Sequence, residues 1–310
     1  MDSKPLCVLV TGSSGFIGTH VVRRLTAAGH RVIGYDLIPP EERFPDGSIY
    51  LCGDIRTARL PHQGIDAVVH LAALAGVRPS MDRPFDYLST NVTGTMRLLE
   101  HCRIHGIPHF VFASSSSVYG PNTPLPAEET ANPDPCSPYA LTKLHGEQWG
   151  RLYSRLHGLR FLALRFFSVW GSGQRPDLAL ECFRTRIEAG QPVVINGDGS
   201  QRRDLTHVED VARAVELALH WKGSGSAVLN VGTGKNHSVM DMLDAATKAA
   251  AALQISGSSF TDFTPPVIHQ EAHPADVPET LASLVAVGKE LGWSPRISFR
   301  NGTASDEKKV

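Results

Sequence analysis

Val8-Leu9-Val10-Thr11-Gly12-Ser13-Ser14-Gly15-Phe16-Ile17-Gly18 is the stretch of sequence that decides the fold. Its apolar start predicts a β-strand, and the residues after Gly18 carry valines and a leucine in a helical pattern. Gly12 allows a tight turn, Gly15 lets the backbone approach a pyrophosphate, and Gly18 lets the helix pack closely on the sheet. The helix N-terminus presents free N–H groups to an anion. The stretch therefore predicts a dinucleotide-binding site.

An acidic residue ends the next predicted strand. Residues 31–35 are followed by Asp36, eighteen residues after Gly18. A carboxylate there accepts both ribose hydroxyls of an adenosine and repels a 2′-phosphate. Glycines alone also occur in structural turns of other parallel sheets, but the acid favours a cofactor site. We therefore expect NAD rather than NADP.

Composition excludes several classes of function. The chain has 310 residues, with 30 Lys and Arg against 31 Asp and Glu, so no basic field favours nucleic acid or a membrane surface. Five cysteines lack a Cys-x-x-Cys pair, and the histidines lack a zinc-ligand spacing, so we expect no disulfide framework and no metal. Without a signal-like N-terminus or an apolar run near ~20 residues, a cytoplasmic location is expected.

Short apolar runs alternate with helical patterns along the chain. Strands are expected at 6–10, 31–35, 49–52, 66–71, 108–114, 160–166 and 227–231, and helices at 16–28, 83–105, 137–157, 177–189 and 204–220. This alternation predicts an α/β fold, a Rossmann-type doubly wound parallel sheet with a smaller C-terminal substrate-binding lobe. We expect residues 1–167 with 205–235 to bind NAD, 168–204 with 236–300 to form the lobe, and 301–310 to be a flexible tail.

A tyrosine and a lysine have the spacing of one helix face. Tyr139 and Lys143 are four residues apart, and the lysine is expected to lower the pKa of the tyrosine. A phenolate can take a proton from a sugar hydroxyl while a nicotinamide takes the hydride. The same spacing is common on solvated helices. Here, however, the strand 110–113 runs into serines 114–117 at the carboxyl edge of the sheet, where ligands bind.

These motifs together resemble the extended short-chain dehydrogenase/reductases of the NAD-dependent epimerase/dehydratase family, over nearly the whole chain. The motifs that carry the resemblance are Thr11 to Gly18, Gly53-Asp54-Ile55-Arg56, His70-Leu71-Ala72-Ala73, Asn91, Ser114 to Gly120, Ser137-Pro138-Tyr139-x-x-x-Lys143, Arg165-Phe166-Phe167, Arg203-Asp204 and Asn230 to Gly234. The resemblance implies a catalytic triad of Ser115, Tyr139 and Lys143, with Ser116 as the alternative hydroxyl. It implies cofactor contacts from Gly12, Gly15, Phe16, Ile17, Gly18, Asp36, Asp54, Ile55, Leu71, Ala72, Ala73, Asn91, Tyr139, Lys143 and Phe166.

The family resemblance also bears on the reaction. Similar dehydratases and decarboxylases carry acidic residues immediately before the Val-Tyr-Gly motif, where this chain has Ser116 and Ser117. Lacking that acid, the site is expected to act as a 4-epimerase. It would remove hydride at the sugar C4, let the ketone rotate, and return hydride to the opposite face.

The sugar is suggested by two segments, 73–80 and 165–177, which resemble UDP-glucuronate 4-epimerases. Ser168 stands where UDP-glucose epimerases usually have asparagine, and Arg175 can bind a C6 carboxylate through a charge-assisted fork. Arg175 also fits an ordinary exposed arginine. The full set of implied substrate contacts is Arg78, Ser116, Ser117, Ser168, Arg175, Val193, Ile195, Arg203 and Asp276.

Several alternatives stay open. The segment 273–276 departs from the family pattern of Arg or Gln, Pro, Gly, Asp, which leaves uridine and thymidine as possible bases. UDP-glucuronate to UDP-galacturonate is the favoured reaction. A UDP-glucose 4-epimerase or another nucleotide-sugar dehydratase or reductase is the runner-up, and a non-catalytic NAD-sensing protein is third. The resemblance further implies a homodimer through the helices at 83–105 and 137–157.

Overall fold

A parallel sheet with strand order β10-β6-β5-β4-β1-β2-β3 is the centre of the molecule. The structure is a computed structural model, and it describes residues 4–41, 44–57, 59–253, 265–272 and 276–299. The strands are β1 (Cys7–Thr11), β2 (Arg31–Asp36), β3 (Ile49–Cys52), β4 (Ala67–His70), β5 (His109–Ser115), β6 (Arg160–Phe166) and β10 (Ser226–Val231). The strand order reverses between β1 and β4, the place where doubly wound sheets bind ligands. The predicted α/β fold is confirmed.

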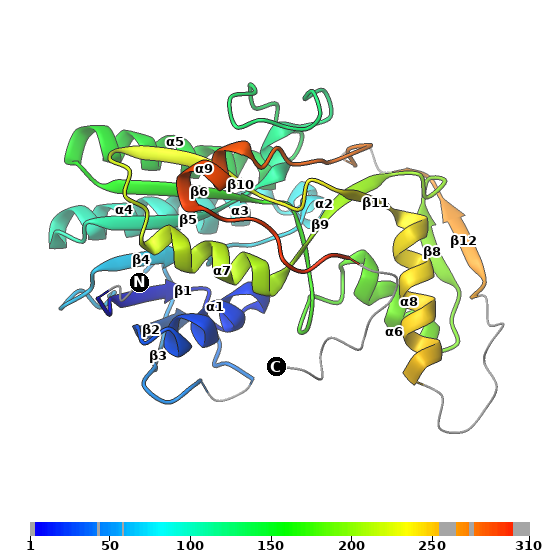
Figure 1. Cartoon of the computed structure of the whole chain (residues 1–310), viewed down its shortest axis with the longest axis horizontal. Coiled ribbons are helices and arrows are strands. Elements are labelled where there is room, and N and C mark those ends of the chain that lie inside the picture. Colours follow the sequence, from blue (N-terminus) through cyan, green and yellow to red (C-terminus); the bar gives the residue numbers. More distant parts are fainter. Residues whose placement is uncertain (1–3, 42–43, 58, 254–264, 273–275, 300–310) are drawn as a thin grey trace.

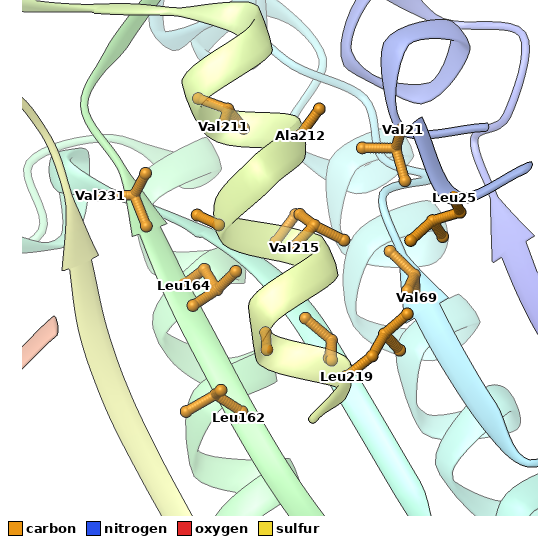
Figure 2. Packing of buried hydrophobic residues seen from close by; sticks show 14 of the residues in the cluster. Val21, Leu25, Val69, Leu162, Leu164, Val211, Ala212, Val215, Leu219 and Val231 are labelled. Carbon is orange, nitrogen blue, oxygen red and sulfur yellow. The ribbon is translucent and has the colours of Figure 1, made fainter. Parts of the chain in front are cut away.

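Helices cover both faces of this sheet (Figure 1). They are α1 (Phe16–Ala27), α7 (Val208–Leu219) and α9 (Val285–Leu291) on one face, and α4 (Gly94–His105) and α5 (Pro138–His157) on the other. Figure 2 shows that the side chains of Val211, Val215 and Leu219 on α7 pack against the sheet. Their spacing gives one apolar stripe, and burial of each side chain contributes roughly 1.5–3 kcal/mol to the free energy of folding.

A second, smaller part lies to the right of the sheet in Figure 1. Its strands β8 (Val193–Asn196) and β12 (Val267–Gln270) are parallel, and α6 (Ala179–Glu188) packs against α8 (Val239–Leu253). The side chains of Val193 and Ile195 are buried in the core that these elements share. Their backbone pairs with β12, and neither residue lines the cavity described below, so the substrate contact expected of them stays a prediction.

The helix expected at 204–220 begins only at Val208. Residues Arg202–His207 instead form β9, between β7 (Ser168–Trp170) and β11 (Asn236–Ser238). Asp204 explains the difference, because its carboxylate accepts hydrogen bonds from the backbone N–H groups of Thr233, Gly234 and Ala282. These partners fix Asp204 in extended backbone at the junction of the two parts.

The helix expected at 83–105 is interrupted. It consists of α3 (Pro84–Tyr87), a π-helical turn η1 (Leu88–Thr93) and α4, and a short α2 (Val77–Asp82) precedes it. The side chain of Asn91 in η1 accepts from the backbone N–H of Leu74 at 2.8 Å and donates to its carbonyl at 2.9 Å. The π turn therefore positions Asn91, which holds the loop after β4 through two hydrogen bonds.

The predicted domain boundaries remain a prediction, but one segment differs from them. Val287 and Trp293 pack in the core of the large sheet, and the Trp293 indole donates to the Asp210 carbonyl at 3.0 Å. The predicted lobe range 236–300 included residues 285–293, but these residues pack with the large sheet. The expected tail at 301–310 and residues 273–275 lie outside the described residues. Across the described ranges, the helices are too short or too polar to span a membrane.

Candidate functional site

A cavity of about 480 Å³ lies at the carboxyl ends of β1, β4, β5 and β6. The predicted residues in its walls are Gly12, Gly15, Phe16, Ile17, Gly18, Leu71, Ala73, Ser115, Ser116, Ser117, Tyr139, Lys143, Phe166, Ser168, Arg175, Arg203 and Asp276. Predicted residues outside these walls are Asp36, Asp54, Ile55, Ala72, Arg78, Asn91, Val193 and Ile195. The cavity thus joins the glycine turn, the triad and most of the expected sugar contacts.

The glycine turn has the geometry of a dinucleotide cradle. Gly12 has φ +72°, and a Cβ on it would lie 2.5 Å from the Ala72 nitrogen. A Cβ on Gly18 would lie 2.0 Å from the Gly12 carbonyl oxygen. Gly15 is the N-cap of α1 and offers no side-chain cap to the first turn. A pyrophosphate can therefore approach the backbone here and accept from the helix N-terminus, so these residues fit NAD.

Asp36 faces the glycine turn. Its carboxylate accepts from the Ser14 N–H at 2.9 Å and from the Leu37 N–H at 2.7 Å, which fixes it at the end of β2. Asp54 is held differently, because Arg56 binds both carboxylate oxygens and keeps the pKa of Asp54 low. Ile55 is buried beneath Gly94. The adenine contacts expected of Asp54 and Ile55 stay predictions.

Asp36→Asn should weaken the discrimination against NADP, because it removes the negative charge that repels a 2′-phosphate. We expect the ratio of the NADP and NAD dissociation constants to fall by about tenfold, which corresponds to about 1.4 kcal/mol. Titration calorimetry with each cofactor measures the two dissociation constants. Asp86→Asn is the control, since that carboxylate is exposed, pairs with Arg83 and lies outside the cavity walls. Mainly NADP released from the denatured wild-type protein would contradict the assigned role of Asp36.

The first turns of α5 position the tyrosine and the lysine. The Ser137 hydroxyl caps the helix by accepting from the Ala140 N–H at 3.1 Å. The Lys143 Nζ donates to the Ala113 carbonyl at 2.8 Å and lies 5.8 Å from the centre of the Tyr139 ring. Lys143 is 5% exposed, and this burial lowers its pKa to about 8.

The pKa of Tyr139 differs from the sequence-based expectation. Burial raises it, while the Ser115 hydroxyl and the positive charge of Arg175 oppose the rise. Lys143 was expected to lower this pKa, but its ammonium is directed to the Ala113 carbonyl. Of the two candidate serines, Ser115 is the one that contacts the tyrosine, and its Oγ also accepts from the Ser117 N–H at 3.1 Å.

A buried histidine ends β4, beside the loop that borders the cofactor cradle. His70 Nδ1 lies 2.7 Å from the Thr11 hydroxyl, and its Nε2 lies 2.9 Å from the Thr95 hydroxyl. Burial and the neighbouring charge of Lys143 lower the pKa of His70 to about 3. The ring is therefore neutral at pH 7 and joins β1, β4 and α4 through hydroxyl groups.

A buried ion pair beneath the cavity was missed by sequence reasoning. Arg165 on β6 donates to both Glu147 carboxylate oxygens at 2.9 and 2.7 Å, and the two side chains are 3% and 6% exposed. Glu147 also accepts from the Ser114 hydroxyl, at 2.5 Å. Helical periodicity could have revealed Glu147, because it lies four residues after Lys143 and therefore on the same helix face. The pair ties α5 to the strand ends that carry Ser115 and Phe166.

Arg175 lies in the cavity wall that also contains Tyr139. Its Nε and one terminal nitrogen donate to the two oxygens of Asp177 at 2.9 and 2.6 Å. The side chain is 36% exposed, and its charge acts on Tyr139. Ser168, at the start of β7, lines the same cavity. Arg175 is therefore a cavity residue rather than an isolated surface arginine.

Two further arginines lie close to Asp276. Arg78 on α2 donates to Asp276 at 2.7 Å, and Arg203 on β9 lies close enough for Asp276 and Arg78 to affect its pKa. Burial lowers the pKa of Arg203, and Asp276 opposes that change. Two guanidinium groups with one carboxylate leave a positive charge that suits an anionic ligand.

Comparisons with known proteins agree with this site. The model of the NAD dependent epimerase/dehydratase family matches residues 8–232. The chain is 34% identical to the UDP-glucuronate 4-epimerase of Thermodesulfobacterium geofontis, over 95% of this chain and 93% of that protein. It is 32% identical to a putative UDP-glucose 4-epimerase of Methanocaldococcus jannaschii, over 95% of each.

Solved structures give the same result. MoeE5 in complex with UDP-glucuronic acid and NAD is 39% identical, with a TM-score of 0.84 and 95% of each chain covered. The UDP-glucuronic acid 4-epimerase from Bacillus cereus, in complex with UDP-glucuronic acid and NAD, is 32% identical, with a TM-score of 0.84, 94% of this chain and 95% of that chain covered. These findings confirm the expected family and the expected cofactor, NAD. The chain therefore belongs to the NAD-dependent epimerase/dehydratase family of enzymes.

Proposed function

We propose that the chain is a 4-epimerase that interconverts UDP-glucuronate and UDP-galacturonate. The observation that carries the proposal is the position of Arg175, a cation in the cavity wall whose charge reaches the catalytic Tyr139. A guanidinium beside the reacting end of the sugar suits a C6 carboxylate. The resemblance to the two proteins solved with UDP-glucuronic acid supports the same substrate.

The triad residues supply the proton chemistry at C4. NAD, held at the glycine turn, would supply the hydride acceptor and donor for the sugar C4. Tyr139 takes the proton from the C4 hydroxyl and later gives it back, while Ser115 donates to the same oxygen. Lys143, buried and held by the Ala113 carbonyl, places a positive charge beside the phenol. The Ser115 hydroxyl and the charge of Arg175 oppose the rise in the Tyr139 pKa that burial causes, so these two groups favour the phenolate.

The absence of an acid at two positions favours epimerisation over elimination. Ser116 and Ser117 line the cavity immediately before Val118-Tyr119-Gly120. Hydroxyl groups at these places can bind the sugar but do not supply the additional acid that loss of water needs. The group of Arg78, Arg203 and Asp276 would hold the diphosphate and the ribose.

Epimerisation of UDP-glucose is the second candidate. Its supporting observation is the Arg175–Asp177 pair, which leaves no net charge from these two side chains at the sugar end. MoeE5 has also been solved with UDP-glucose and NAD. A non-catalytic NAD sensor is disfavoured, because it would not need the buried Lys143 beside Tyr139.

The assembly and location are further parts of the proposal. A homodimer through 83–105 and 137–157 is supported by exposed apolar side chains on these segments, among them Phe85, Ile104 and Leu156. A cytoplasmic location is supported by the free cysteines among the described residues.

Arg175→Ala should remove the preference for a uronic acid. We expect the ratio of kcat/KM for UDP-glucuronate to that for UDP-glucose to fall by roughly tenfold to hundredfold, since a carboxylate loses its charged partner. Steady-state kinetics with products resolved by NMR measures both constants. Arg184→Ala is the matched control, because Arg184 is paired with Glu181 and Glu188 on α6 and lies outside the cavity walls.

Two results would contradict this substrate. An unchanged ratio would mean that Arg175 does not contact the carboxylate. A wild-type preference for UDP-glucose would move the function to the second candidate, while the roles of Tyr139, Ser115 and Lys143 would stand.

A further inference from the structure

His20 lies on α1, just after the glycine turn, and it is not among the cavity walls. The side chain is 8% exposed. Its Nδ1 lies 2.5 Å from a carboxylate oxygen of Glu209 on α7, and its Nε2 lies 2.9 Å from the backbone carbonyl oxygen of Ser172. One imidazole therefore bridges the cofactor helix, α7 and the loop after β7.

Both partners of this ring are hydrogen-bond acceptors. A peptide carbonyl can only accept, and the hydrogen bond from His20 keeps the pKa of Glu209 low, so its carboxylate is ionised. A neutral imidazole has one N–H and one lone pair, so one of its nitrogens would face an acceptor without a proton. The two contacts are satisfied together only when both nitrogens carry protons.

The Ser172 carbonyl belongs to a constrained turn. Gly171 and Gly173 flank it with φ +138° and φ +76°, and a Cβ on Gly171 would lie 2.7 Å from Val208 at the start of α7. The Gln174 N–H closes the turn by donating to the Gly171 carbonyl at 3.2 Å. Arg175 is the next residue. Only three peptide units therefore separate the carbonyl that His20 holds from Arg175.

We infer that His20 is a positioning residue that, as an imidazolium, ties the Gly171–Arg175 turn to the cofactor helix α1. The ring links the part of the chain that holds NAD to the part that faces the sugar. Its effect on sugar binding rests on the proposed function of Arg175, whereas its charge state and its hold on the turn do not.

Other charged and aromatic groups surround the ring. Arg24, one turn further along α1, pairs with Glu216 of α7, and His207 precedes α7. Both Arg24 and His207 act on Glu209, and the Phe16 ring meets the His20 ring edge to face at 6.0 Å. Glu209 and the Ser172 carbonyl are therefore the two acceptors that hold the ring nitrogens.

The first test reads the charge state directly. In wild-type protein labelled with ¹⁵N-histidine, we expect both ring nitrogens of His20 to carry protons at pH 7. In Glu209→Gln the ring should carry a single N–H under the same conditions, because the amide can itself donate to Nδ1. A wild-type ring with a single N–H at pH 7 would overturn the inference.

The second test reads the turn. Hydrogen exchange of the 171–174 amides should speed up at least tenfold in His20→Gln, with NAD content unchanged. Arg24→Ala is the matched control, because Arg24 joins the same two helices without contacting Ser172. Exchange accelerated equally in both variants would show that His20 only joins α1 to α7, and would overturn the inference.

The third test reads sugar binding. With whichever UDP-sugar the wild type converts, KM should rise about fivefold to tenfold in His20→Gln while kcat changes less than twofold. A changed kcat with unchanged KM would overturn the positioning role. A preference for UDP-glucose would refute the proposed substrate and leave the first two tests intact.

Discussion

Tyr139→Phe is expected to lower turnover at least ~100-fold, the effect typical of a lost general acid–base group. The substitution removes only the hydroxyl, and the ring can still pack edge to face on Tyr87, 6.3 Å away. NAD should remain bound, because the glycine turn, Asp36 and Lys143 are unchanged. NMR of the UDP-sugar products measures turnover, and the absorbance of cofactor released by denaturation measures NAD content.

The matched control for this prediction is Tyr153→Phe. Tyr153 lies on the same helix, and its hydroxyl donates to Glu100 at 3.0 Å, outside the cavity. Its turnover should stay near the wild-type value. Near wild-type turnover in Tyr139→Phe would exclude Tyr139 as the group that moves the proton.

Glu147→Ala is expected to give the largest loss of stability, about 3–5 kcal/mol in the free energy of unfolding. The substitution leaves the guanidinium of Arg165 buried without its carboxylate, and it also removes the acceptor of the Ser114 hydroxyl. One Arg165 terminal nitrogen already lacks a hydrogen-bond partner among the described residues. Urea unfolding followed by circular dichroism measures the change.

Asp244→Asn is the surface control for this prediction. It breaks an exposed ion pair with Lys248 on α8, which contributes at most about 0.5 kcal/mol. Glu147→Gln, which keeps an oxygen acceptor but loses the charge, should fall between the two. A loss in Glu147→Ala no larger than in Asp244→Asn would mean that Arg165 finds another partner or reaches water.

The large sheet was predictable because its central strands are buried on both faces. Strands β5 and β6 contain the apolar runs 110–113 and 161–164, which are visible without any tertiary information. The strand β9 was missed, because Arg202, Arg203 and Asp204 are polar and are held by partners distant in the chain. Periodicity does not report such partners.

The candidate site shows the same division. The glycine turn and the triad come together as expected, since each depends on local spacing and on the carboxyl edge of the sheet. The direction of the Tyr139 pKa was wrong, because burial depends on the packed structure. The pairing of Arg175 with Asp177 also depends on the shape of a loop, which spacing does not define.

The π turn at Leu88–Thr93 makes the segment between α3 and α4 sensitive to the deletion of a single residue. A π turn holds one residue more than an α-helical turn, so removing one residue there would allow a regular helix from α3 into α4. Each residue turns a helix by about 100°, so the deletion would rotate Asn91 away from Leu74. A homologue or engineered variant that is one residue shorter here should therefore lose the two hydrogen bonds between Asn91 and Leu74, unless another side chain replaces them. The sequence of the loop after β4 would not reveal that loss, because the deletion lies elsewhere in the chain.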